Sequence, residues 1–256
     1  MSLMRPPRTA WGDIPDVLIH SSESNVKQHP DYRAAKSGDA EAAKNLINDT
    51  INNNQVEALR ALVVDKEIPI LVSAHALEAD GINAIPDVFA NILSKILGWN
   101  HSIGIVQTNV VSHTGSNGYG RLSRPANFDG TIEPGRNYVI VDDFVALGGT
   151  LANLKGHIET NGGHVIGAVS LTGKQYSAKL KVSKERLDEL RNKHPELEQW
   201  WKHHFGHTFD ALTESEARYL ARSPDVNTIR NRIAEEESIR NETSSGIADS
   251  ELSNLA

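Results

Sequence analysis

Residues 139–151, VIVDDFVALGGTL, constrain the fold of this chain more than any other stretch. The β-branched run Val139-Ile140-Val141 is typical of a buried parallel strand, and the residues from Leu151 onward (LANLKGHIE) have the pattern of a helix. Two acids and then a glycine-rich turn lie between them. A strand, a turn and a helix in this order predict an α/β fold, whose open sheets bind ligands at the carboxyl ends of their strands.

The turn itself predicts an anion site. Gly148 and Gly149 allow backbone N–H groups to approach a phosphate closely, Thr150 adds a hydroxyl, and the helix that follows presents its positive end. Asp142 and Asp143 at the end of the strand are suited to sugar hydroxyls, so the combination predicts a phosphorylated sugar as ligand. The alternative is a strand that ends in two solvated acids and a glycine-rich turn, as in many α/β proteins.

The same segment resembles the phosphoribosyl-pyrophosphate (PRPP) signature of type I phosphoribosyltransferases, which is a short hydrophobic strand, two acids, a few residues and Thr-Gly-x-Thr. The resemblance implies that Asp142 and Asp143 hold the ribose 2′ and 3′ hydroxyls. It also implies that the following loop wraps the 5′-phosphate through Ala146, Leu147, Gly148, Gly149 and Thr150. Leu147 stands where the family usually has Thr, which marks the chain as a divergent member.

The resemblance further implies a doubly wound, mainly parallel sheet and an enzyme of the pentosyltransferase class. The reaction would transfer 5-phosphoribosyl from PRPP to a small nitrogen heterocycle, with release of pyrophosphate and inversion at the anomeric carbon. Mg²⁺ is the expected cofactor, with Asp142 and Asp143 as its contacts through ribose or water. Some purine-specific members have an acid at the position of Ala146, whereas adenine- and orotate-type members do not. A homodimer is also implied.

A first strand at residues 68–74 leads into HALEADGIN, where the family has its pyrophosphate loop. The candidates there are His75, Ala76, Glu78, Gly81 and Asn83. Such loops often carry a basic residue, but this one has no Lys or Arg. Glu78 is an alternative contact for Mg²⁺ or its waters.

Residues 112–130 are too long and polar for an ordinary connection, and the family has a flexible loop at this position that closes over the site. Tyr119, Arg121 and Arg124 are the candidates for contacts with pyrophosphate or with the closed site, and a mobile surface hairpin is the alternative. The resemblance assigns no general base. His113, Asp129 and Glu133 remain possible.

The chain divides into four parts by its patterns. Residues 1–30 are predicted to be irregular, 31–182 to form the α/β core, 183–240 to be helical and 241–256 to be a disordered tail. The core contains predicted helices at its start, including an apolar face at Ala42, Leu46 and Ile47. Further strands are predicted at 103–111 and 165–171, and a helix follows residue 85 with Pro86 in its first turn and Gly98 at its end.

Composition narrows the partners. The 256 residues carry a formal net charge of −7 and show no basic stripe, which argues against nucleic acid. Cysteine is absent and no apolar run reaches the length of a membrane span, so a cytoplasmic protein without a membrane partner is expected. Residues 200–209 gather tryptophan, histidine and phenylalanine, which favours either a helix that docks on the sheet or a hood that stacks a nucleobase.

Three functions therefore remain open. The preferred one is a phosphoribosyltransferase. The alternatives are a PRPP-binding regulatory protein with reduced catalysis and a phosphoribosyl hydrolase.

Overall fold

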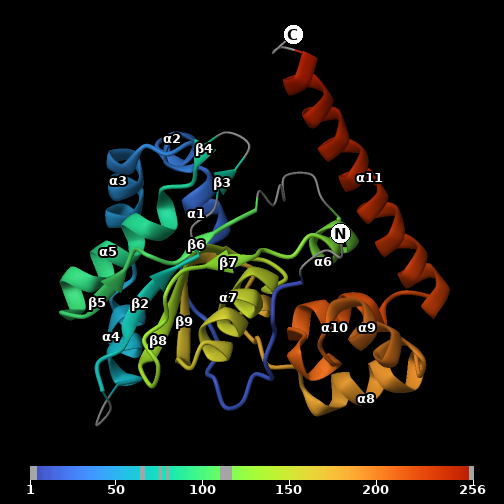
Figure 1. Cartoon of the computed structure of the whole chain (residues 1–256). Helices are drawn as coiled ribbons and strands as arrows, with labels where there is room; N and C mark the ends of the chain where they lie inside the picture. Colours follow the sequence, from blue (N-terminus) through green and yellow to red (C-terminus); the bar gives the residue numbers. More distant parts are fainter. Residues whose placement is uncertain (1–4, 64–66, 75–76, 79–80, 110–116, 254–256) are drawn as a thin grey trace.

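A sheet of five parallel strands lies at the centre of the computed structural model (Figure 1). The structure describes residues 5–63, 67–74, 77–78, 81–109 and 117–253. The strand order is β1-β9-β8-β2-β5. The strands are β1 (Leu18–Ser21), β2 (Ile70–Ser73), β5 (Asn100–Ser102), β8 (Asn137–Val145) and β9 (His164–Gly173). The predicted mainly parallel sheet is confirmed.

Helices cover both faces of the sheet, so the predicted doubly wound α/β fold is also confirmed. On one face, Val139 and Val141 of β8 pack in a cluster with residues of the first five helices. These are α1 (Glu23–Lys27), α2 (Tyr32–Lys36), α3 (Ala40–Thr50), α4 (Asn53–Ala61) and α5 (Ile85–Leu97). On the other face, Tyr138 and Ile140 pack against α7 (Gly149–Thr160). Alternate side chains of β8 therefore contribute to two separate hydrophobic cores, one on each face of the sheet.

The predicted helices begin and end at the capping residues that the sequence indicates. α3 begins after Asp39, whose side chain accepts hydrogen bonds from two amides of the first turn. Ala42, Leu46 and Ile47 are buried, as predicted from their spacing. α5 has Pro86 in its first turn and ends at Gly98, whose φ of 71° suits glycine.

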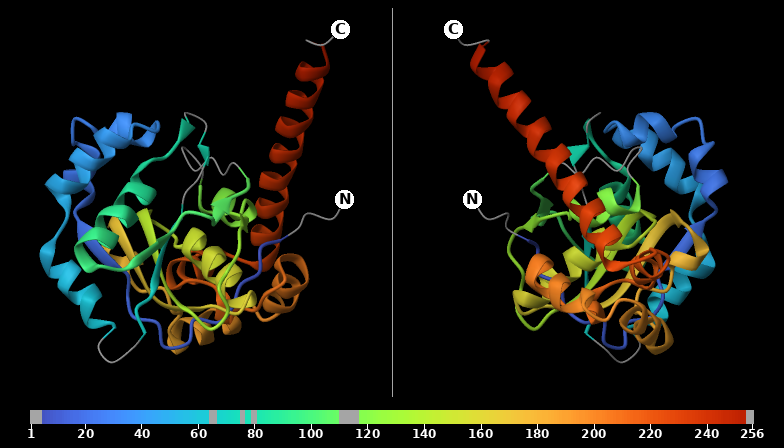
Figure 2. Two further views of the ribbon diagram at one scale, coloured as in Figure 1. Left: turned by 60° about the vertical axis from the view of Figure 1, so that its left-hand side comes forward. Right: turned by 90° about the vertical axis from the view of Figure 1, so that its right-hand side faces the viewer.

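The C-terminal region forms a third core beside the sheet (Figure 2). It consists of α8 (Lys184–Lys193), α9 (Leu197–Phe205), α10 (Glu214–Ala221) and α11 (Val226–Ser253), and the far part of α11 extends away from the body. Trp201 and Phe209 are buried in this cluster, which also includes Tyr119 from α6 (Gly118–Ser123). The tryptophan therefore docks on neighbouring helices and not on the sheet, in contrast to the sequence prediction.

Residues 5–17 run as a strap between α7 and the C-terminal region. Lys155 of α7 is buried and donates to the Thr9 hydroxyl and the Ala10 carbonyl. Trp11 donates through its indole N–H to the Leu212 carbonyl at 2.6 Å. The strap thus links two parts of the chain that the sequence pattern does not connect.

Several boundaries differ from the sequence prediction. Residues 1–30 are not irregular throughout, because they contain β1 and α1. The strand predicted at 103–111 is present only in part, since Val106–Gln107 form the short β6 outside the main sheet. The strand in the main sheet is the polar β5, and Ile103 after it is 75% exposed. An edge strand is not obliged to be apolar on both faces, which hid β5 from a search for apolar runs.

Two further predictions change. The segment 112–130 was expected to lack regular structure, but it includes α6 and also β7 (Phe128–Asp129), which pairs with β6 (Val106–Gln107). Over residues 241–253 the predicted tail is wrong, since the backbone there continues α11. No helix of the described residues is long and apolar enough to cross a bilayer.

Candidate functional site

The carboxyl ends of β2 and β8 mark the topological switch point of the sheet, where this fold is expected to bind a ligand and which we call the crevice. β2 continues through α5 to β5 on one side, whereas β8 continues through α7 to β9 on the other. The two strands are neighbours with Ser73 opposite Val141, and the Ala74 amide donates to the Val141 carbonyl at 2.8 Å. Loops that leave adjacent strands in opposite directions open a crevice between them, and ligands of open α/β sheets bind there.

Asp142 and Asp143 lie near the end of β8, beside this crevice. Asp142 is buried, and its Oδ1 accepts from the Asp143 amide at 2.8 Å. Burial, and then the neighbouring Asp143 carboxylate, raise the pKa of Asp142 well above its ordinary value. Asp143 is partly exposed and forms an ion pair with Lys36 of α2, with 3.1 Å between Nζ and Oδ2. The pair thus offers one carboxyl that favours the protonated form and one that is held by a cation.

The predicted phosphate turn, residues 146–150, connects the end of β8 to the start of α7. Gly148 caps the start of α7 with a φ of 83°, and a Cβ at this position would lie 2.9 Å from the Leu180 side chain. Glycine is therefore required by both backbone conformation and space. The first amides of a helix have no partners within the helix, and a glycine cap has no side chain to satisfy them. Thr150 lies in that first turn and is partly buried.

The C-terminal region docks on this turn. The Thr213 hydroxyl donates to the Leu147 carbonyl, and a Cβ on Gly149 would lie 2.9 Å from Oε1 of Glu216. Glu216 is buried and is held by Arg8 of the strap through two hydrogen bonds of 2.7 and 3.0 Å. The sequence around Thr213 carries the signature of a helix start, which the structure realises as a capping box, but no local signal indicates that this helix would contact the turn.

The acids suit a metal that is held mainly by its substrate. No group of three or more His, Cys, Asp or Glu that could hold a metal ion occurs among the residues described. Mg²⁺ commonly uses one or two carboxylates together with substrate phosphates and several waters. Asp142 and Asp143 therefore fit Mg²⁺ in this role, whereas they do not form a complete metal site of their own.

Part of the predicted pyrophosphate loop has a structural role. His75 and Ala76 lie outside the described residues. The backbones of Glu78 and Gly81 are paired between β3 (Leu77–Glu78) and β4 (Gly81–Ile82). Asn83 is buried, and its Oδ1 accepts from the Ile85 amide at 3.1 Å, so this side chain helps to begin α5.

Two of the three flexible-loop candidates have partners in the C-terminal region. Tyr119 is buried, with its hydroxyl hydrogen-bonded to Ser223. Arg124 pairs with Glu236 of α11 at 2.7 Å. Contacts of these residues with pyrophosphate stay a prediction. Arg121 lies on the same short helix and is partly buried.

The candidate general bases are not brought to the acids. Glu133 pairs with Arg136 just before β8 begins, which is the opposite end of that strand from Asp142. Asp129 is exposed and accepts a hydrogen bond from the Gly130 amide, while the Gly130 carbonyl contacts His157 near the end of α7. His113 lies outside the described residues.

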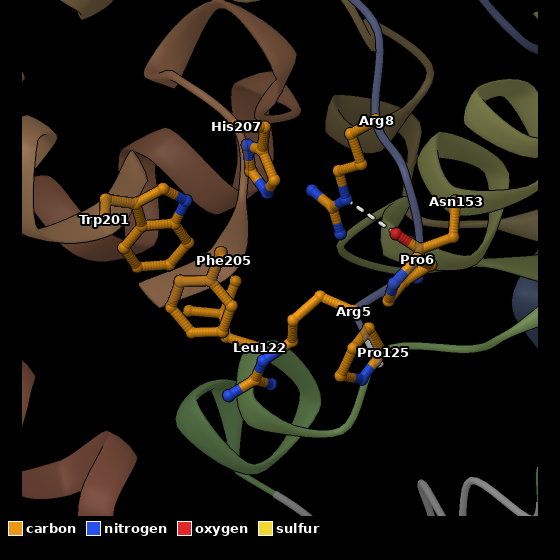
Figure 3. A pocket seen from close by; sticks show the side chains of 9 residues that line it. All are labelled: Arg5, Pro6, Arg8, Leu122, Pro125, Asn153, Trp201, Phe205 and His207. Carbon is orange, nitrogen blue, oxygen red and sulfur yellow. Dashed lines mark hydrogen bonds between the residues drawn. The ribbon is translucent and has the colours of Figure 1, made fainter. Parts of the chain in front are cut away.

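A small cavity lies where the strap meets the C-terminal region (Figure 3). It is lined by Arg5, Pro6, Arg8, Leu122, Pro125, Asn153, Trp201, Phe205 and His207. Its volume of about 10 Å³ holds one water molecule, far less than a nucleobase needs. Burial mainly, with help from Arg8, lowers the pKa of His207 to about 3, so its ring is neutral. The hypothesis of a stacking hood built from Trp201 and Phe205 is therefore not supported by this cavity.

Comparisons with known proteins give relatives by sequence but no family model that matches. The chain is 39% identical over 234 residues to Protein TraN of Escherichia coli, which is 91% of this chain and 52% of TraN. It is 40% identical over 152 residues to an uncharacterized protein of Haemophilus influenzae, covering 59% of this chain and 34% of the other. The chain thus spans about half the length of the first relative and about a third of the second.

Among solved structures, the adenine phosphoribosyltransferase of Leishmania donovani is similar over 51% of this chain and 57% of its own. The TM-score is 0.32 and the sequence identity is 16%. At this level of similarity, function has to be inferred from the residues of the crevice themselves.

Proposed function

We propose that the crevice between β2 and β8 binds PRPP and that the protein transfers its 5-phosphoribosyl group to a nitrogenous base, with release of pyrophosphate. The observation that carries this proposal is the position of the signature-like segment. Asp142 and Asp143 lie near the end of β8, and the glycine turn with the start of α7 follows within a few residues. A ribose at the acids would have its 5′-phosphate within reach of that turn.

In this proposal the residues of the chain bind and orient PRPP and stabilise the charge that develops during its reaction. The amides of Gly149 and Thr150 donate to the 5′-phosphate. Asp142 and Asp143 hold the ribose hydroxyls, and the Asp143 carboxylate stabilises the positive charge that develops on the ribose. The bond from the anomeric carbon to the diphosphate breaks with its electron pair on the diphosphate oxygen. A ring nitrogen of the base forms the new bond from the opposite face and releases its proton. Asp142 and Asp143 would hold Mg²⁺, directly or through water, and the bound ion would supply positive charge for the leaving group.

A second candidate is a PRPP-binding regulator. It is favoured by the contact of Thr213 with the Leu147 carbonyl and of Glu216 with Gly149, which connect the phosphate turn to the C-terminal region. Phosphate bound at the turn would compete with the buried Glu216 carboxylate for the field of the helix start, because both are anions. Binding of PRPP would then shift the position of α10.

One assay separates the candidates. The protein is incubated with PRPP, Mg²⁺ and a panel of nucleobases while pyrophosphate release is measured. Base-dependent release supports the transferase, binding of PRPP without turnover supports the regulator, and base-independent release supports a hydrolase.

A matched variant tests the site itself. Asp142→Asn combined with Asp143→Asn should abolish PRPP binding in calorimetry and leave the far-UV circular dichroism spectrum unchanged. Asp13→Asn, a fully exposed acid of the strap, is the control and should bind as wild type does. Unchanged affinity for PRPP in the double variant would mean that Asp142 and Asp143 do not hold the ribose.

A further inference from the structure

The small cavity beside the strap is lined by a buried polar group that the protein itself does not satisfy (Figure 3). Trp201 is 1% exposed and belongs to the apolar core of the C-terminal region, yet its Nε1 has no hydrogen-bond partner among the described residues. A buried indole N–H normally has an acceptor, because a buried donor without one lowers stability. Trp201 therefore requires an acceptor that no described side chain or carbonyl supplies.

Trp11 of the strap shows the normal arrangement. Its ring is 4% exposed, and its indole N–H donates to the Leu212 carbonyl at 2.6 Å. Burial alone therefore does not separate the two tryptophans. Trp201 differs in that its side chain lies on the wall of the cavity.

His207 offers an acceptor on the same cavity. Its ring centroid lies 6.1 Å from that of Trp201, and Figure 3 shows the indole nitrogen on the edge of Trp201 that faces His207. Nδ1 of His207 lies 2.9 Å from the Thr208 carbonyl oxygen, and because a carbonyl only accepts, Nδ1 carries the proton of the ring. Burial, and then Arg8, lower the pKa of His207 to about 3, so the ring is neutral and Nε2 is left as an acceptor.

Asn153 of α7 adds a second buried donor to the wall. Its Oδ1 accepts from Nε of Arg8 at 2.6 Å, whereas its Nδ2 has no partner among the residues that the structure describes. The cavity is thus lined by two unpaired N–H donors and the acceptor nitrogen of His207. Its volume of about 10 Å³ fits one water molecule. Water both accepts and donates, as this wall requires, whereas a monatomic anion only accepts.

We propose that this cavity is a binding site for one ordered water molecule, which accepts a hydrogen bond from Nε1 of Trp201 and donates one to Nε2 of His207. The water links α9 to the segment that follows it. Arg8, which holds Glu216 at the start of α7, lines the same cavity, so the water belongs to the contact between the strap and the C-terminal region. The site is independent of PRPP binding.

The test compares the indole N–H signals of Trp201 and Trp11 in the full chain by nuclear magnetic resonance. The Trp201 N–H should show a nuclear Overhauser cross-peak with water that is opposite in sign to its rotating-frame cross-peak, which marks a water molecule that stays bound. The Trp11 N–H should show no such pair of cross-peaks, because it donates to Leu212. Trp201→Phe removes one indole signal and thereby assigns it.

Two variants test the acceptor. His207→Phe keeps a ring of similar size and removes Nε2, so the Trp201 cross-peak with water should be lost. His203→Phe, which replaces an exposed histidine of α9, is the control and should keep it. Thermal unfolding and the Trp11 signal verify that each variant retains the fold.

A crystal structure of the wild type tests the same site without any substitution. Water density within hydrogen-bonding distance of Nε1 of Trp201 and Nε2 of His207 supports the inference. The inference is overturned if that density is missing, if wild-type Trp201 lacks the cross-peak with water, or if the cross-peak persists in a folded His207→Phe variant.

Discussion

Replacing Arg8 by Met should destabilise the protein strongly, because it leaves the carboxylate of Glu216 buried without its counter-ion. The side chains of Arg8 and Glu216 are only 7% and 2% exposed. Arg8 donates to both carboxylate oxygens, at 2.7 and 3.0 Å, and its Nε donates to Asn153 at 2.6 Å. In the Arg8→Met variant, Glu216 keeps its hydrogen bond from the Thr213 amide, which cannot neutralise the charge.

Removing one partner of a buried ion pair costs about 3–5 kcal/mol. For a chain of this size, each kcal/mol lowers the melting temperature by about 2–4 °C, so the expected decrease is about 6–20 °C. The free energy of unfolding is measured by urea titration followed by far-UV circular dichroism, and the melting temperature by calorimetry. Lys44→Met, which breaks the exposed pair with Glu41, should cost less than about 0.5 kcal/mol.

The double variant tests whether the loss of stability comes from the uncompensated charge. Combining Arg8→Met with Glu216→Gln removes the uncompensated charge, so the loss should be smaller than the sum of the single losses by at least about 1 kcal/mol. A loss below about 1 kcal/mol for Arg8→Met, or additive losses in the double variant, would refute the view that this ion pair fastens the strap and α10 to the start of α7.

Three further predictions concern single side chains. Burial and Asp143 raise the pKa of Asp142, so its charged form opposes folding. The stability of Asp142→Asn relative to wild type should therefore rise as the pH increases above 3.8. Urea titrations at about pH 5 and about pH 8 test this, and a constant difference would contradict it. Burial lowers the pKa of His20 from 6.5 to about 4, so the unfolded state binds the proton more readily and wild type should lose about 2 kcal/mol as the pH falls from about 8 to about 5. His20→Asn should not show that part of the loss. Leu147→Thr should tighten PRPP binding in calorimetry if the turn holds the 5′-phosphate, whereas unchanged affinity would indicate a cradle made of backbone alone.

The candidate site was partly accessible from sequence because its signals are local. A β-branched run, two acids, glycines and an apolar helix occupy consecutive positions around Asp142 and Gly148, and each has a conformational preference that does not depend on distant residues. The structure keeps that order and adds the position of the turn beside β2. In contrast, Lys36 was not a candidate, since the ion pair that it forms with Asp143 joins residues 107 positions apart.

The contacts that sequence reasoning missed join segments that are distant in the sequence and depend on how their surfaces pack. Sequence reasoning did not predict that Tyr119 and Arg124 contact Ser223 and Glu236 of the C-terminal region. The pattern of a polar, glycine-rich segment indicates only that it is not a buried strand. Its partners are decided by long-range packing, for which the sequence has no periodic signal.

The sequence by itself determined the class of fold and the nature of the turn at 142–150, because strand, turn and helix preferences are set by neighbouring residues. Only the tertiary structure decided that β2 and β8 are adjacent, that Arg8 and Glu216 meet at the start of α7, and that Lys36 reaches the acids. These contacts form because the two faces of the sheet and the C-terminal helices must bury their apolar surfaces together. That requirement acts on the whole chain and not on any segment of it.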